Sequence, residues 1–218
     1  MTLILPGIGA PLVKAPFQPP TVLASSTNTQ SGTTTHTCAA PGGGGPGDLL
    51  YLIFAYGVSS GTPSFSQSWG TEISGLSGYS GTYAITIIRT ATGSDDFTGT
   101  TSSNVQSAIA MVRVKYYNNV RGEMAVGSGT NNTLAWTSTN MGSSAPTLWL
   151  ASASVKNNGG YPAGTPTNYS LVNRALNTSA NGCSVSVWQR TLTGQTEDPP
   201  DASGISGGRW ATFASGFR

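Results

Sequence analysis

The stretch that decides the fold is Pro41-Gly-Gly-Gly-Gly-Pro-Gly-Asp-Leu-Leu-Tyr-Leu-Ile-Phe-Ala-Tyr56. A glycine-rich turn leads directly into a run of apolar and aromatic residues, and no charge follows Asp48 within that run. Such a run is too short to cross a membrane as a helix and is typical of a strand buried on both faces. We therefore predict an interior β-strand over residues 49–56.

Most of the remaining chain alternates apolar and polar residues with a period of two, which is the pattern of half-buried strands. In residues 107–116 one face carries small or β-branched side chains (Ala108, Ala110, Val112, Val114), and the other changes from apolar to basic (Ile109, Met111, Arg113, Lys115). Further strands are expected near 21–25, 33–39, 64–73, 82–90, 97–102, 122–126, 133–138, 147–155, 168–174, 183–190 and 209–214. The sequence predicts an all-β fold, an antiparallel β-sandwich of the jelly-roll or immunoglobulin-like kind.

Two features interrupt the strand pattern. Asn181-Gly182 is a strong tight-turn signal just before a strand. Residues 194–208 form the longest stretch without a strand pattern, and we expect a surface loop there. No stretch shows a helical period with capping residues.

Residues 1–20 are expected to form an extended proline-rich arm that precedes a sandwich domain over residues 21–218. Prolines at positions 6, 11, 16, 19 and 20 keep this segment out of a central sheet. It is nevertheless apolar, and an extended apolar segment needs a surface to lie on. We expect its large side chains to bind this subunit or a neighbour: Leu3, Ile4, Leu5, Ile8, Leu12 and Phe17. The first residues lack the basic leading region of a signal peptide.

Charged residues are rare, at 8% of the chain against about 25% in an ordinary soluble domain. The ten Lys and Arg residues are scattered and form no run, so we expect no nucleic-acid partner. No segment is long and apolar enough for a transmembrane helix, so we expect no membrane partner. Many Gly, Ser, Thr and Asn residues and a net charge of +2 suit a β protein whose surface is largely shared with neighbours.

Residues suited to nucleophilic catalysis are few. His36 is the only histidine, and alternation places it on the same strand face as Cys38. A catalytic dyad is conceivable, but a structural histidine is the favoured interpretation. Cys38 and Cys183 are the only cysteines, and free buried thiols are favoured over a disulfide. The glycine tract 42–45 leads into a strand and lacks the ending of a phosphate-binding loop.

The acidic residues predict neither a metal site nor a glycosidase. Calcium could use carboxylates of the 194–208 segment together with a second acidic pair (Glu197, Asp198, Asp201, Asp95, Asp96), but their spacing matches no calcium loop. A glycoside hydrolase needs two carboxylates facing one cleft, and no strand carries a paired acid pattern. We predict no catalytic residues, no metal and no cofactor.

The tryptophans are the best candidates for ligand contacts: Trp69, Trp136, Trp149, Trp188 and Trp210. Exposed tryptophans can stack on sugars, and they can equally fill a core or anchor an interface, which is the favoured interpretation. Trp149 shares a strand face with alanines, which predicts burial. Trp188 shares its face with serines and Arg190, which predicts a surface or interface aromatic residue.

Several short motifs resemble a β-sandwich module of tailed-bacteriophage virion proteins. They are Met-Thr-Leu-Ile-Leu-Pro-Gly-Ile-Gly at the start, Pro-Gly-Asp-Leu-Leu at 46–50, Ser-Trp-Gly at 68–70, Ile-Ile-Arg-Thr-Ala-Thr-Gly at 87–93 and Val-Arg-Val-Lys-Tyr-Tyr at 112–117. The likeness covers about residues 40–155, and the motifs mark strand edges and turns.

The resemblance implies a non-enzymatic structural protein of the virion, assembled in the host cytoplasm. Its partners would be other virion proteins, such as the major capsid or a tail protein, and copies of itself. A capsid decoration or cement subunit is the first expectation. The alternative is a tail or head-fibre component with a receptor- or glycan-binding sandwich.

Overall fold

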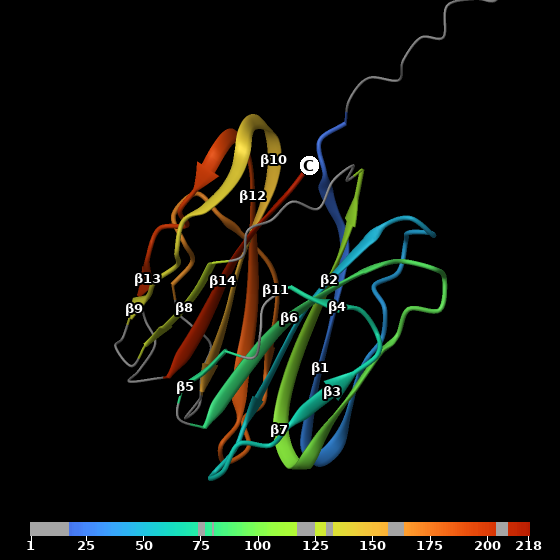
Figure 1. The fold of residues 1–218 in the computed structure, drawn as a ribbon, viewed down its shortest axis with the longest axis vertical. Coiled ribbons are helices and arrows are strands. Elements are labelled where there is room, and N and C mark those ends of the chain that lie inside the picture. The colour runs from blue at the N-terminus through green and yellow to red at the C-terminus, as the bar shows by residue number, and fades with distance from the viewer. Residues whose placement is uncertain are drawn as a thin grey trace, which may run out of the picture.

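The computed structural model describes residues 18–73, 77–79, 81–116, 125–129, 133–156, 164–203 and 209–218. The described residues form strands and connecting loops, and they contain no helix that could cross a membrane. Two sheets pack face to face as an antiparallel β-sandwich (Figure 1). The predicted all-β sandwich is therefore confirmed.

The first sheet is built from the N-terminal half of the chain. Its strand order is β1 (Thr21–Cys38), β7 (Phe97–Lys115), β2 (Leu49–Gly57), β6 (Thr82–Thr90) and β4 (Thr71–Glu72), with β3 (Phe65–Gln67) on β7 and β5 (Ser77–Tyr79) on β6. The strand predicted over residues 49–56 is β2, and each of its residues is buried. Because β2 lies between β7 and β6, the glycine-rich turn leads into an interior strand, as predicted.

The second sheet is built from the C-terminal half. Its strand order is β11 (Ser170–Leu176), β12 (Cys183–Glu197), β10 (Thr139–Lys156), β14 (Trp210–Phe217) and β8 (Ala125–Gly129). A small third sheet pairs β13 (Ala202–Ser203) with β9 (Thr133–Leu134). The expected loop over residues 194–208 is wrong in part, because β12 continues to Glu197 and β13 lies within that range.

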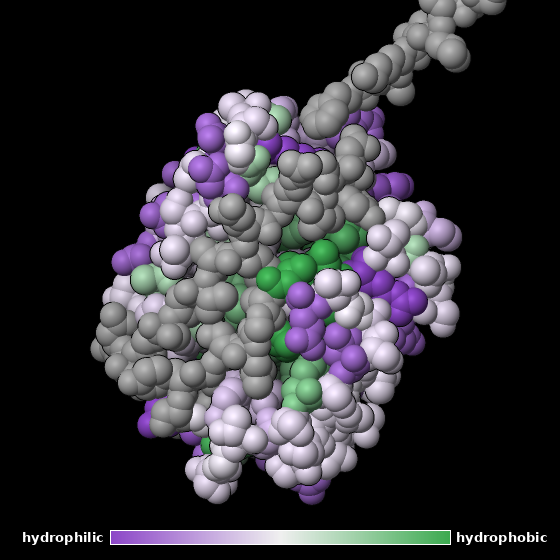
Figure 2. Space-filling model, in the orientation of Figure 1, coloured by the Kyte–Doolittle hydropathy of each residue, from purple (hydrophilic) through white to green (hydrophobic). Residues whose placement is uncertain are grey.

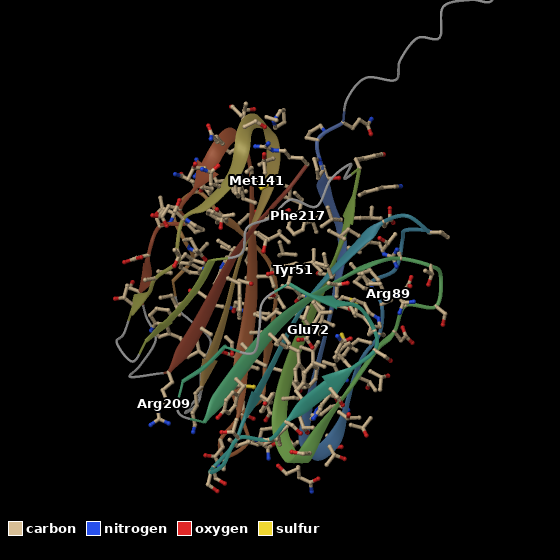
Figure 3. All side chains as sticks on the ribbon, viewed as in Figure 1. Tyr51, Glu72, Arg89, Met141, Arg209 and Phe217 are labelled. Atoms are coloured by element: carbon tan, nitrogen blue, oxygen red, sulfur yellow. The ribbon has the colours of Figure 1, made fainter. Side chains whose placement is uncertain are left out.

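The main core lies between the two sheets, so the inner face of each half of the chain is buried against the other half. The alternation of residues 107–116 is confirmed, because Ala108, Ala110, Val112 and Val114 all point into this core. Tyr51 of β2 meets Phe217 of β14 edge to face, with 5.8 Å between ring centroids (Figure 3). The Tyr51 hydroxyl also lies 2.8 Å from the Ser152 hydroxyl, so the one polar atom of that ring has a partner.

The outer face of the first sheet is covered by its own strands. β1 and β7 bend together near Gly32, whose φ is 64°, and their distal halves fold back over the sheet. Asn28 accordingly donates to the Thr37 carbonyl oxygen at 2.7 Å across the fold. A second apolar cluster fills the space beneath, so the face of β2 that bears Phe54 is as dry as the face that bears Tyr51.

The outer face of the second sheet is covered in the same way. The distal part of the β10–β12 ribbon bends near Gly142, and Thr139 donates to the Ala214 carbonyl oxygen at 3.1 Å. Met141 therefore lies against the outer side of this sheet (Figure 3). On the face viewed in Figure 2 apolar surface is exposed mainly in one central area, and much of the remaining coloured surface is polar or only weakly apolar.

The two ends of the sandwich differ. At one end the β11–β12 turn is held against the first sheet, because Asn177 donates to the carbonyl oxygens of Gln30 at 2.7 Å and Ser107 at 3.2 Å. The predicted tight turn is present there, with Asn181 in the left-handed region at φ 61°. The opposite end, where β1 begins and the C-terminus lies, is called the arm end below (Figure 1).

Candidate functional site

The six arm residues predicted to bind a partner precede Gln18 and lie outside the described residues, so that assignment stays a prediction: Leu3, Ile4, Leu5, Ile8, Leu12 and Phe17. The described part of the arm is Gln18, Pro19 and Pro20. Gln18 is exposed and Pro20 is buried, so within these three residues the chain meets the sandwich at Pro20. The arm end is therefore where any contact made by the arm has to start.

The large apolar side chains that remain exposed gather around this point. Among the described residues they are Leu23, Leu171 and Tyr116, with 40%, 43% and 48% of their surface exposed. Tyr116 directly follows Lys115, which pairs with Thr21 at the start of β1. We call these three residues the arm-root residues.

Leu23 and Leu171 lie on two neighbouring edge strands. Asn173 of β11 donates to the Ser25 hydroxyl of β1 at 2.9 Å, and Asn177 contacts β1 farther on, at Gln30. The two strands thus run in the same direction along one edge of the sandwich. Leu23 and Leu171 each lie two residues before the Ser25–Asn173 contact, which places both at the arm end.

A groove of about 310 Å³ opens between the sheets at the same place. Thr21 and Val22 of β1 form one wall, and Ser170 of β11 with residues 189–191 of β12 form the other. Leu148 of β10, which is 1% exposed, also lines the groove and belongs to the main core. The groove therefore leads from a polar rim to the apolar core between the sheets.

Both edge strands that border this groove are bulged beside it. The β1–β7 register shifts between Val22 and Ala24, so Leu23 has no partner on β7. The β11–β12 register shifts between Leu171 and Asn173. A β-bulge bends its strand and interrupts the regular ladder, and bulges are frequent at sheet edges and functional sites. The two bulges bend β1 and β11 apart beside the groove. Farther along both strands, the Asn173–Ser25 hydrogen bond joins them.

Arg190 is the charged residue that lines the groove, and it has an ionic partner. Its guanidinium nitrogen lies 2.9 Å from a Glu197 carboxylate oxygen, which also accepts from the Tyr169 hydroxyl at 3.0 Å. Burial and the neighbouring Glu197 charge raise the pKa of Tyr169, so its hydroxyl stays a proton donor. The rim of the groove is therefore polar but close to neutral.

His36 is fully buried and hydrogen-bonded, which confirms the structural interpretation. Nδ1 lies 3.0 Å from the Ser107 hydroxyl and Nε2 lies 3.0 Å from the Thr101 hydroxyl. Burial lowers the pKa of His36 from 6.5 to about 4. Cys38 instead contacts Ser26 and the Ala39 carbonyl oxygen, so the conceivable dyad is not formed.

The remaining candidates for chemistry are also structural. Cys38 and Cys183 are buried free thiols, as favoured from the sequence, and burial raises the pKa of Cys183 to about 12. Asp95 binds the Thr92 and Gly93 backbone and pairs with Arg89, while Glu197 pairs with Arg190. No cluster of metal-ligating side chains occurs among the residues that the structure describes.

The prediction that Trp188 is a surface or interface residue is wrong. It is 2% exposed and meets Trp136 edge to face at 5.9 Å, within the apolar cluster on the outer side of the second sheet. The serines on its strand face, Ser184 and Ser186, are buried too. The other four tryptophans are also buried, including Trp149 as predicted, so the chain has no exposed tryptophan for sugar stacking.

A second hollow, of about 230 Å³, lies at the end opposite the arm. Its polar lining residues carry only neutral groups: Ser59, Ser60, Ser103, Asn104, Gln106 and Asn181. The Gln106 side-chain oxygen is buried and has no hydrogen-bond partner among the described residues. This hollow could accept a small neutral ligand rich in hydroxyl groups.

No protein-family model matches the chain, and no curated protein or solved structure matches it either. Three features therefore bear on function: the sequence motifs, the groove at the arm end and the polar hollow at the opposite end.

The sequence predicted a binding role for the arm but not the surface beside it. Leu23 and Leu171 look like ordinary strand residues, because alternation alone does not reveal a bulge. The available signal was the pair of prolines directly before β1, which marks the start of the strand as a place where the chain leaves the sheet.

Proposed function

We propose that this chain is a non-enzymatic structural protein of a tailed-bacteriophage virion, acting as a capsid decoration or cement subunit. In this role it binds neighbouring virion proteins and copies of itself. The proposal combines the motif likeness over about residues 40–155 with one structural observation. The exposed arm-root residues and the groove all lie where the apolar arm joins the sandwich.

The distribution of apolar surface supports a binding role for this end. Both faces of each sheet are covered by the chain itself, so broad sheet faces are not available for assembly. Exposed apolar groups that gather at one place are typical of interaction surfaces. Each large arm side chain that becomes fully buried would contribute roughly 1.5–3 kcal/mol, reduced by the cost of ordering the arm.

The interior supports a role without catalysis. The histidine and both cysteines are buried, and the ionic pairs join neighbouring parts of the fold. Catalytic groups need access to a substrate, whereas His36 and the two cysteines are hydrogen-bonded to hydroxyl groups and backbone carbonyl oxygens in the interior. A sandwich whose outer faces are covered by its own strands, and whose loops and strands are joined by ionic pairs, suits a subunit that has to stay rigid on a particle.

Copy counting by quantitative mass spectrometry of purified particles tests the proposal. Hundreds of copies per particle are expected for a decoration subunit. A number near three, six or twelve would assign the chain to the tail or to a fibre, and absence from the particles would overturn a virion role.

A deletion tests the arm. Removing residues 2–17 should leave a folded sandwich that no longer stays on washed particles, and each 1.4 kcal/mol of lost binding weakens retention about tenfold. The matched control is Lys14→Gln, which changes the charge of the arm but none of its apolar groups. Full occupancy by the truncated protein would show that the arm is not the anchor.

A second function, receptor or glycan binding by a fibre component, is favoured by a different observation. The neutral polar hollow beside Gln106 and Asn181 offers hydroxyl and amide groups of the kind that bind sugar hydroxyls. A glycan-array screen with wild-type protein and Gln106→Leu tests it. Binding that is lost in the variant would support this function, and an array without binding would remove it.

A further inference from the structure

We propose that the groove at the arm end binds the N-terminal arm of a second copy of this chain. This inference rests on the proposed function, because it names the partner of the same surface. It assigns both sides of the contact: the arm is the donor, and the groove between β1 and β11 is the acceptor.

The shape and polarity of the groove fit an extended apolar peptide. Leu148 and Val22 offer apolar contacts continuous with the main core, and Leu23 and Leu171 extend the apolar surface outside the groove. The rim residues Ser170, Gln189 and Thr191 carry donors and acceptors that a peptide backbone can use. When an extended peptide binds along a sheet edge, main-chain hydrogen bonds give affinity and pockets for its alternate side chains give specificity. The polar rim and the small apolar floor of this groove offer both kinds of contact.

The arm has the length and composition that this groove requires. Seventeen residues precede Gln18, and they can extend up to roughly 55 Å at about 3.3 Å per residue. They are largely apolar and carry one charged side chain, Lys14. Arg190 is the charged residue that lines the groove and it is already paired with Glu197, so the described lining offers no unpaired charge that would favour a charged partner over an apolar one.

The arm in the groove is expected to come from another copy. Thr21 and Val22 line the groove themselves, so the arm of the same chain would have to reverse just before them. Pro19 and Pro20 have fixed φ angles, and a proline also holds the residue before it in an extended conformation. The chain at Gln18–Pro20 therefore resists the tight turn that would return its own arm to the groove.

Exchange of arms gives each copy one donor and one acceptor. If the two contacts are reciprocal the result is a closed dimer, and if they pass from copy to copy the result is a ring. In both assemblies the arm-root residues would become buried. This accounts for the exposure of the arm-root residues, whereas the other large apolar side chains of the described residues are buried or half-buried.

Disulfide trapping between two differently tagged chains tests the inference. One chain carries a cysteine in the arm, placed in turn at Leu3, Ile8, Leu12 or Phe17, and the other carries Ser170→Cys in the groove. The native cysteines are buried, so wild-type protein reports the background. The matched control is Ser59→Cys, an exposed serine that lines the hollow at the opposite end.

After mild oxidation we expect at least one arm position to cross-link to Ser170→Cys about tenfold more than to Ser59→Cys. A double variant, with both cysteines in one chain, should likewise give linked pairs of chains. Linkage only within single chains would assign the groove to the arm of the same copy and overturn the inference. Cross-linking no greater than the control at every arm position would also overturn it.

This experiment uses purified protein, so it is separate from the particle test. Trapped pairs of a chain that is absent from particles would leave the inference standing and overturn the virion role. If the chain is abundant on particles but no cross-linked pairs form, the virion role stands and the inference about the groove is overturned.

Discussion

Acidification should destabilise the sandwich through His36, whose side chain is buried between the two halves of the folded-back β1–β7 ribbon. Burial lowers its pKa from 6.5 to about 4, so between these values the unfolded chain binds a proton that the folded chain does not. The stability that neutral His36 contributes is therefore fully present above pH 6.5 and is lost as the pH falls toward 4. At about 1.36 kcal/mol per pKa unit the loss is roughly 3 kcal/mol.

The cause of this effect is the surroundings of the ring. Ser107 and Thr101 offer hydroxyl groups to its two nitrogens, and Phe54 lies 5.2 Å from it, centroid to centroid. None of these side chains carries a negative charge that could stabilise a buried imidazolium. Protonation of the folded state is therefore opposed by desolvation that nothing offsets.

The measurement is urea unfolding followed by tryptophan fluorescence at several pH values, on wild type and on His36→Gln. Glutamine keeps an amide for one hydroxyl partner but does not titrate, so groups that titrate in both proteins cancel in the comparison. Between about pH 7.5 and pH 4 the unfolding free energy of wild type should fall roughly 3 kcal/mol more than that of the variant. Parallel pH profiles would refute the reasoning, because His36 would then be protonated as easily in the folded state as in the unfolded state.

Three further substitutions test the interior by the same unfolding assay. Arg113→Met should cost about 3–5 kcal/mol, because it leaves the buried Asp48 carboxylate without its cation; a loss below about 1 kcal/mol would show that the pair is dispensable. Gly44→Ala should cost about 1–3 kcal/mol, because a Cβ would collide with Asp48 and Arg113, whereas Gly45→Ala has open space and should be nearly neutral; equal effects would contradict this placement of the turn. Trp188→Ala should cost about 3–5 kcal/mol because it removes a large buried side chain, and an unchanged stability would show that Trp188 is not a core residue.

The sequence predicted the inner faces of the sandwich well because strand geometry alone decides them. Side chains on a strand point alternately to opposite sides, so the two faces of residues 107–116 follow once a strand is assigned. The buried run at 49–56 was equally clear, since a strand that is apolar on both faces has to be covered on both. These are local properties, and no knowledge of distant contacts was needed.

The outer faces could not be predicted in this way, because the coverage comes from residues far away in the sequence. The serine neighbours of Trp188 indicated a surface position, but Trp136 packs against its ring, within the cluster that also holds Met141 of the folded-back β10 segment. Arg113 was expected on a basic face, yet it is buried and donates to the Pro41 and Gly45 carbonyl oxygens. The glycine tract thus has a structural task that its sequence did not reveal: it wraps around the Arg113 side chain.

The same fold-back that misled the tryptophan prediction explains where the chain can bind. A two-sheet sandwich normally leaves its outer faces to solvent or to partners, but here distal strand segments occupy both. Binding is then left to edges and ends, and one end is braced by Asn177 against the first sheet. At the other end the bulges at Leu23 and between Leu171 and Asn173 part the edge strands, and the chain enters through two prolines. Under the proposed exchange, an apolar arm attached at this point adds contact area at one end of the sandwich, so a second copy would be held while both sheets remain intact.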